Sequence, residues 1–93
     1  MKIEELNDVW DAIEDTPEEA ENMRLRSELM RSIDSVIKKQ NLTQVEAAKR
    51  FGVTQPRISD LVRGKISLFS LDVLIAMVVT GGMRVQIDIK HAT

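Results

Sequence analysis

Cysteine and tyrosine are absent from this sequence, which contains one histidine, one tryptophan and two phenylalanines. Without cysteine the chain can form neither a disulfide nor a thiolate metal site, which suits the reducing cytoplasm. It also lacks a glycine-rich phosphate loop, because Gly81-Gly82 has no flanking motif, and no pair of acids is placed in an evident pocket. We therefore expect a cytoplasmic protein that is not an enzyme and needs no cofactor, metal or small-molecule ligand.

Long apolar runs are also absent, since no stretch approaches the length of about 18 residues that a membrane-spanning helix requires. The first residues are acidic and lack the apolar core of a signal peptide. A chain of 93 residues, 43% of them hydrophobic, has room for one globular domain and an arm. We expect no contact with a membrane.

Charge is divided unevenly along the chain. Residues 1–22 hold nine acids and one base, a net charge of −8, whereas residues 23–93 hold twelve bases and six acids, a net charge of +6. The overall charge of −2 therefore conceals a basic body behind an acidic start. This asymmetry is typical of chains with two different partners.

Residues 43–65 have the residue types and spacing of two short helices joined by a tight turn. Thr43 and Thr54 can each cap a helix, because a threonine side chain accepts a hydrogen bond from a free N–H group of the first turn. Gly52 falls where the first helix ends, and glycine adopts a positive φ there without strain. The pattern predicts a helix-turn-helix whose core contains Ala48, Gly52, Val53, Ile58 and Leu61.

The second helix of this motif is polar where it would face DNA, and its N-terminal end would enter the major groove. Glutamine can pair with adenine, arginine with guanine and aspartate with cytosine, and an apolar group can contact a thymine methyl. The predicted base contacts are Gln55, Pro56, Arg57 and Asp60. The predicted phosphate contacts are Gln44, Thr54, Ser59, Arg63, Lys65 and Ser67.

Each of these assignments has a local alternative. Pro56 could simply start the helix, and Asp60 could pair with Arg57 or Arg63. Lys49 and Arg50 could be solvated surface charges. A helical hairpin without a role on DNA would also have this spacing, although it would not need the polar positions of the second helix.

The flanking segments predict two further helices and a strand. Thr16-Pro17-Glu18-Glu19 is a strong helix start, and the helix should run to about Lys39 with its first two turns beyond the core. We predict that its buried stripe contains Ala20, Met23, Leu29, Ile33, Val36 and Ile37. Ser70 should cap another helix, which ends near Val79 and is apolar on nearly all sides, as expected of a central helix.

Apolar and polar residues then alternate from Met83 to Lys90, which predicts a half-buried strand. A lone strand needs a partner for its backbone N–H and C=O groups. That partner could be the same strand of a second copy, residues 2–6, or the sheet of another protein. For pairing across a homodimer, the apolar face of the strand would contribute Val85, Ile87 and Ile89.

The predicted fold is thus mostly α, a helix-turn-helix bundle of about four to five helices with one C-terminal β-strand. Residues 1–15 form an acidic N-terminal arm. Residues 16–93 form the DNA-binding domain, with the helix-turn-helix at 43–65.

The motif resembles the Cro/CI-like (XRE) helix-turn-helix family, whose frame is matched here by Thr43-Gln44, Ala48, Gly52, Thr54-Gln55, Ile58, Leu61 and Gly64-Lys65. That resemblance implies a lambda-repressor-like bundle. A narrower likeness to HigA-type antitoxins covers about residues 9–90, through the segments 10–20, 24–29, 42–44 and 68–72 before the terminal strand.

The narrower resemblance implies an autorepressing antitoxin, which binds the operator of its own operon and holds a small basic ribonuclease toxin of the RelE/HigB type inactive. Carboxylates of the arm would attract a cationic toxin. We place this contact at Trp10, Asp11 and Glu14, although Trp10 could instead dock on the long helix of its own chain. A stand-alone XRE-family repressor without a toxin and a pure protein-interaction module are the alternatives.

Overall fold

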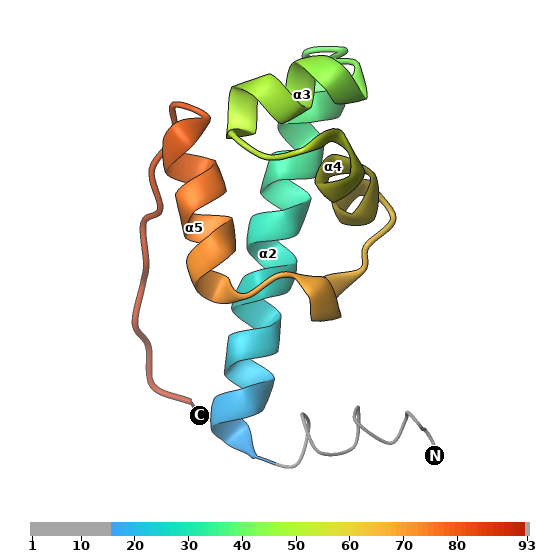
Figure 1. Ribbon diagram of the computed structural model, residues 1–93. Helices are drawn as coiled ribbons and strands as arrows, with labels where there is room; N and C mark the ends of the chain where they lie inside the picture. Colours follow the sequence, from blue (N-terminus) through green and yellow to red (C-terminus); the bar gives the residue numbers. More distant parts are fainter. Residues whose placement is uncertain (1–15, 93) are drawn as a thin grey trace, which may run out of the picture.

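The computed structural model describes residues 16–92, and the predicted arm, with Trp10, Asp11 and Glu14, lies outside them. Within residues 16–92, four α-helices and one 3-10 turn follow in order: α2 Pro17–Lys39, α3 Gln44–Phe51, α4 Gln55–Val62, η1 Ile66–Leu68 and α5 Leu71–Thr80. Figure 1 shows the shorter elements gathered around α2. This arrangement confirms the predicted mostly helical bundle. None of the helices described is long and apolar enough to cross a bilayer.

Each helix begins at a hydroxyl residue, as predicted. The side chains of Thr16, Thr43, Thr54 and Ser70 each accept a hydrogen bond from a backbone N–H group of the first turn. Thr43 forms a complete capping box, because the Glu46 side chain also accepts from the Thr43 backbone N–H at 2.8 Å. These caps define where the two eight-residue helices α3 and α4 start.

The core lies along one face of the C-terminal part of α2. Met30, Ile33 and Ile37 are buried there, and α5, α4 and η1 pack against this helix. The predicted stripe was correct for Ile33 and Ile37 and wrong for Ala20, which is exposed, and it left out Met30. The periodicity gave the correct face but extended it too far toward the N-terminus, where α2 projects beyond the other helices (Figure 1).

Helix α5 is apolar all round but is not buried all round. Leu74, Met77 and Val78 lie in the core, whereas Ile75 and Val79 are 36% and 59% exposed. The prediction of a central helix is therefore correct for the face that packs on α2 and α3 and not for the face that carries Ile75 and Val79. The other side keeps an apolar surface in contact with solvent.

Residues 83–92 run past α5 as a single extended segment (Figure 1). Met83 and Val85 are half-buried and pack against the core, whereas Ile87 and Ile89 are 62% and 92% exposed. No strand is present within residues 16–92 of this single chain. Strand pairing across a dimer through Val85, Ile87 and Ile89 stays a prediction.

Arg50 joins the C-terminal ends of three helices. Its Nε donates to the carbonyl oxygen of Gly81 at 3.0 Å, and its guanidinium also donates to the Gln40 side chain, so that the caps of α5 and α2 are both tied to α3. Phe51 lies beneath this tie, and a Cβ atom on Gly81 would come within 2.5 Å of its ring. Arg50 is thus held by contacts within the chain and is not the solvated surface charge that the sequence allowed.

Replacing Arg50 by methionine should lower the free energy of unfolding by about 1–3 kcal/mol, because the Gly81 carbonyl and the Gln40 amide lose a charged donor. Lys49→Met is the matched control, since Lys49 is an exposed cation on the same helix and its replacement should change the stability by less than about 0.5 kcal/mol. Urea unfolding followed by circular dichroism measures both. Equal effects of the two substitutions would contradict the role given to Arg50.

Candidate nucleic-acid interface

Helices α3 and α4 pack together as the two helices of a helix-turn-helix. Gly52 closes α3 with φ of 71°, the left-handed conformation that glycine adopts without strain. Ile58 and Leu61 are 0% and 2% exposed, Ala48 is buried and Val53 is half-buried. Four of the five residues predicted for the core of the motif are thus buried or half-buried, whereas Gly52 is exposed and acts through its backbone.

The N-terminal end of α4 presents polar groups to solvent. Gln55 and Pro56 are exposed in the first turn, and Thr54 is exposed although its side chain caps the Arg57 N–H at 3.3 Å. Ser59 is half-buried one turn further on. The remaining predicted phosphate contacts are all exposed, at Gln44, Arg63, Lys65 and Ser67. The predicted DNA-contacting residues are therefore accessible at the N-terminal end of α4 and in the turn that follows its C-terminal end.

Arg57 has a different environment from Gln55. Its guanidinium donates to the carbonyl oxygen of Leu68 at 3.0 Å and lies 5.1 Å from the centre of the Phe69 ring. A charged hydrogen bond contributes about 1.5–3 kcal/mol, and a cation–π contact about 0.5–2 kcal/mol. A guanine contact that broke both would gain only about 1–3 kcal/mol. Base recognition by Arg57 stays a prediction, and its contacts with the Leu68 carbonyl and the Phe69 ring compete with it.

Asp60 also has a partner within the chain. Its carboxylate lies 3.7 Å from the Nζ atom of Lys65, which is neither of the two arginines considered from the sequence. Both side chains are partly exposed, at 30% and 47%, so the pair contributes at most about 1 kcal/mol. Such a weak pair can separate when DNA approaches.

A second arginine holds the loop that follows α4. Arg26 of α2 donates from one nitrogen to the carbonyl oxygens of Ile66 and Phe69, at 3.1 and 3.2 Å, and its Nε donates to Asn22 at 2.8 Å. The loop therefore has three carbonyl oxygens bound by arginines, since Leu68 is bound by Arg57. Nothing in the sequence around Arg26 distinguishes it from a solvated cation, so the sequence analysis missed it.

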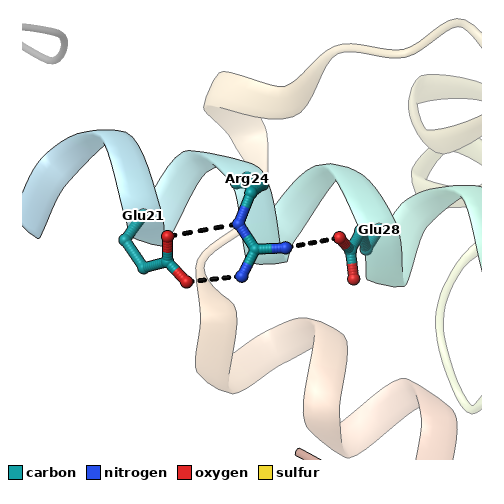
Figure 2. Close-up of polar contacts among 3 residues, drawn as sticks. All are labelled: Glu21, Arg24 and Glu28. Atoms are coloured by element: carbon teal, nitrogen blue, oxygen red, sulfur yellow. Dashed lines mark hydrogen bonds and ion pairs between the residues drawn. The ribbon is translucent and has the colours of Figure 1, made fainter. Parts of the chain in front are cut away.

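The projecting half of α2 forms a second, acidic surface. Figure 2 shows Arg24 between Glu21 and Glu28, with Nε donating to Glu21 at 3.1 Å and a terminal nitrogen donating to Glu28 at 2.6 Å. The hydrogen bonds from Arg24 hold the pKa of the Glu21 carboxyl below its ordinary value. One arginine thus bridges two acids, and the surface keeps a net negative charge.

A groove of about 850 Å³ opens beside this surface, between α2, α5 and the C-terminal segment. Its apolar lining includes Leu25, Leu29, Ile75 and Val78, and charged residues of α2 and of residues 84–90 form its rim. In Figure 1, α4 and the C-terminal segment lie on opposite sides of α2. The groove is therefore remote from the exposed end of the recognition helix.

A packed α3–α4 pair, a glycine turn and an exposed polar helix end define a helix-turn-helix module, the class of fold that binds double-stranded DNA. Residues 12–90 match the family model described as "Helix-turn-helix domain", and the chain belongs to this family. The match includes the last four residues of the predicted acidic arm, 12–15, and the C-terminal segment as far as residue 90. Comparison with curated proteins finds no match.

Proposed function

We propose that this protein is an autorepressing antitoxin, which binds the operator of its own operon and neutralises a RelE/HigB-like ribonuclease toxin by direct contact. The observation that carries the proposal is the separation of two surfaces. Helix α4 lies beside the C-terminal half of α2, whereas the acidic N-terminal half of α2 projects beyond the other helices (Figure 1). One molecule can therefore engage DNA and a protein partner at the same time. We further propose that it does so in the cytoplasm and without catalysis.

The DNA side of the proposal places base recognition at the first turn of α4. Gln55 is the strongest candidate, because its exposed amide can donate to and accept from adenine. Pro56 beside it offers an apolar contact to a thymine methyl. The proposed phosphate contacts are Gln44 on α3, Thr54 and Ser59 at and in α4, and Arg63, Lys65 and Ser67 after its C-terminal end; all are exposed except Ser59, which is half-buried.

The toxin side of the proposal rests on charge and on the HigA-type resemblance. Carboxylates of the arm and of the first half of α2 attract a cationic ribonuclease over a long range. Trp10, an aromatic side chain within the acidic run, is the anchor we propose, with Asp11 and Glu14 beside it.

We propose that the protein acts as a homodimer. Ile87 and Ile89 are exposed on the C-terminal segment, and Ile75 and Val79 on α5 add to the apolar surface left open by one chain. Pairing of the segment with that of a second copy would satisfy its backbone groups and cover these side chains. Helix-turn-helix dimers bind two half-sites about 34–36 Å apart.

A stand-alone repressor is the second candidate. The family match favours it, because the family is described only as a helix-turn-helix domain, over residues 12–90. That description supports DNA binding and does not mention a toxin. The two candidates share the operator and the dimer and differ in the toxin.

Gln55→Ala should reduce discrimination at one operator base pair by about 1–3 kcal/mol, that is, between fivefold and 150-fold. Fluorescence anisotropy with an operator selected from random DNA, and with its single-base variants, measures this effect. Gln86→Ala is the matched control, because Gln86 is exposed on the C-terminal segment. An unchanged affinity and salt dependence in Gln55→Ala would show that Gln55 does not contact DNA.

Replacing Ile87 and Ile89 together by aspartate should convert the dimer to a monomer, because two charges would then lie in the apolar interface. Sedimentation equilibrium gives the mass, and circular dichroism checks that the helices remain. The control replaces Gln86 and Lys90 by aspartate, at the alternate positions of the segment, and should remain dimeric. A wild-type chain that is monomeric at every concentration would rule out the homodimer.

The small open reading frame beside this gene should encode the toxin and inhibit growth when expressed alone. Co-expression with this protein should restore growth and yield a stable complex of the two proteins. A Trp10→Ala variant should weaken that complex by roughly 30-fold or more if Trp10 is an anchor residue, and it should still bind DNA. Gln55→Ala is the reciprocal control, since it should bind the toxin normally and lose operator discrimination. A neighbouring product that is harmless and forms no complex would leave the stand-alone repressor.

A further inference from the structure

We propose that Arg57 is a positioning residue and that base recognition is left to Gln55 and Pro56. Together with Arg26 it holds the loop of residues 65–69 against the protein, so that Lys65 and Ser67 meet a DNA phosphate from a fixed position. This inference rests on the proposed binding of DNA and specifies how the recognition helix and the loop share the work.

The contacts that carry the proposal come from two different helices. Arg57 of α4 donates to the carbonyl oxygen of Leu68, and Arg26 of α2 donates to those of Ile66 and Phe69. Phe69 is 1% exposed and anchors the end of the loop in the core, beneath the Arg57 guanidinium. The loop has one short 3-10 turn and a few local backbone hydrogen bonds, and the two arginines fasten its carbonyl oxygens to α2 and α4.

Binding the three carbonyl oxygens also prepares the loop electrostatically. A carbonyl oxygen carries partial negative charge, and one directed at a phosphate would repel it. Here the oxygens of Ile66, Leu68 and Phe69 are directed toward guanidinium groups, while the side chains of Lys65 and Ser67 remain exposed. The loop therefore offers the Lys65 ammonium and the Ser67 hydroxyl as donors to the DNA backbone, while these three carbonyl oxygens bind arginines.

Arg57 and its neighbours differ in what they would lose on contacting a base. Gln55 and Pro56 are exposed in the first turn of α4 and can enter the major groove of DNA without breaking a side-chain hydrogen bond within residues 16–92. Arg57 is half-buried and would have to leave both the Leu68 carbonyl and the Phe69 ring. Moving it would release the loop that carries two of the predicted phosphate contacts.

The test compares Arg57→Met with Arg26→Met, because Arg26 lies on α2 and reaches the same loop from outside the recognition helix. Each variant is titrated with the selected operator and with its single-base variants over a range of salt concentrations. Both should lose about tenfold in affinity for every DNA, and the slope of log K against log salt should fall by about one for a lost phosphate contact. Their discrimination between bases should remain that of the wild type.

Discrimination is a ratio of affinities of one variant, so partial unfolding does not alter it. The double variant should lose little more than either single variant, since both act through the loop. Arg31→Met, which removes an exposed cation of α2 that donates to no loop carbonyl within residues 16–92, should keep the wild-type slope. Arg57→Lys should recover part of the affinity, because lysine retains one donor.

Loss of discrimination at a single base pair in Arg57→Met, with none in Arg26→Met, would overturn the proposal and make Arg57 a base contact. Hydrogen exchange of the free protein tests the loop without DNA, at the amides of Leu68 and Phe69, which donate to Lys65 and Ile66. Exchange there should accelerate in both variants, and unchanged exchange would overturn the positioning role. A wild-type chain that binds no DNA sequence would refute the proposed function separately.

Discussion

Packing against α2 is the constraint on which the other elements depend. Isolated helices of eight residues are marginal in water, because nucleation fixes several residues for each hydrogen bond formed. Helices α3 and α4 are each that short, and both bury apolar residues in the core that Met30, Ile33 and Ile37 help to form. Capping by Thr43 and Thr54 determines where the helices start, but burial against α2 and α5 gives them their stability. A recognition helix this short is rigid only as part of the whole bundle.

Three arginines connect elements that the core alone would leave loosely joined. Arg50 joins the ends of α2, α3 and α5, and Arg26 and Arg57 secure the loop between α4 and α5. Four of their acceptors are backbone carbonyls at a helix end or in the loop, and the other two are the side chains of Gln40 and Asn22. Guanidinium suits this task, because its several donors can serve more than one acceptor while the side chain covers an aromatic ring. In a chain with few aromatic residues, these contacts do part of the work that large side chains do elsewhere.

The helix boundaries and the helix-turn-helix core could be predicted from the sequence because their signals are local. A hydroxyl at the cap, Pro17 or Pro56 in a first turn, and Gly52 at a helix end each act within about four residues. The partners of Arg26, Arg50 and Arg57 lie up to 43 residues away, and a surface cation carries no sign of a distant carbonyl. Periodicity likewise identified the buried face of α2 but not its extent, so Ala20 was included and Met30 was missed. Alternation from Met83 to Lys90 predicted a strand that residues 16–92 of the structure do not contain, because alternation gives a segment two faces but specifies no pairing partner.

The close approach of Phe51 to Gly81 has a consequence for the spacing between operator half-sites that a dimer of this protein could bind. Gly81 ends α5 only two residues before Met83, where the segment proposed to join two copies begins, and Phe51 ends the first helix of the motif. The ring leaves no room for a side chain at Gly81, so only Gly82 separates the proposed dimer segment from a helix end packed on the first helix of the motif. In the proposed dimer, the distance and angle between two recognition helices would then be built in before DNA arrives. Operators whose half-sites are displaced by a base pair would be rejected by geometry, even where every base matched.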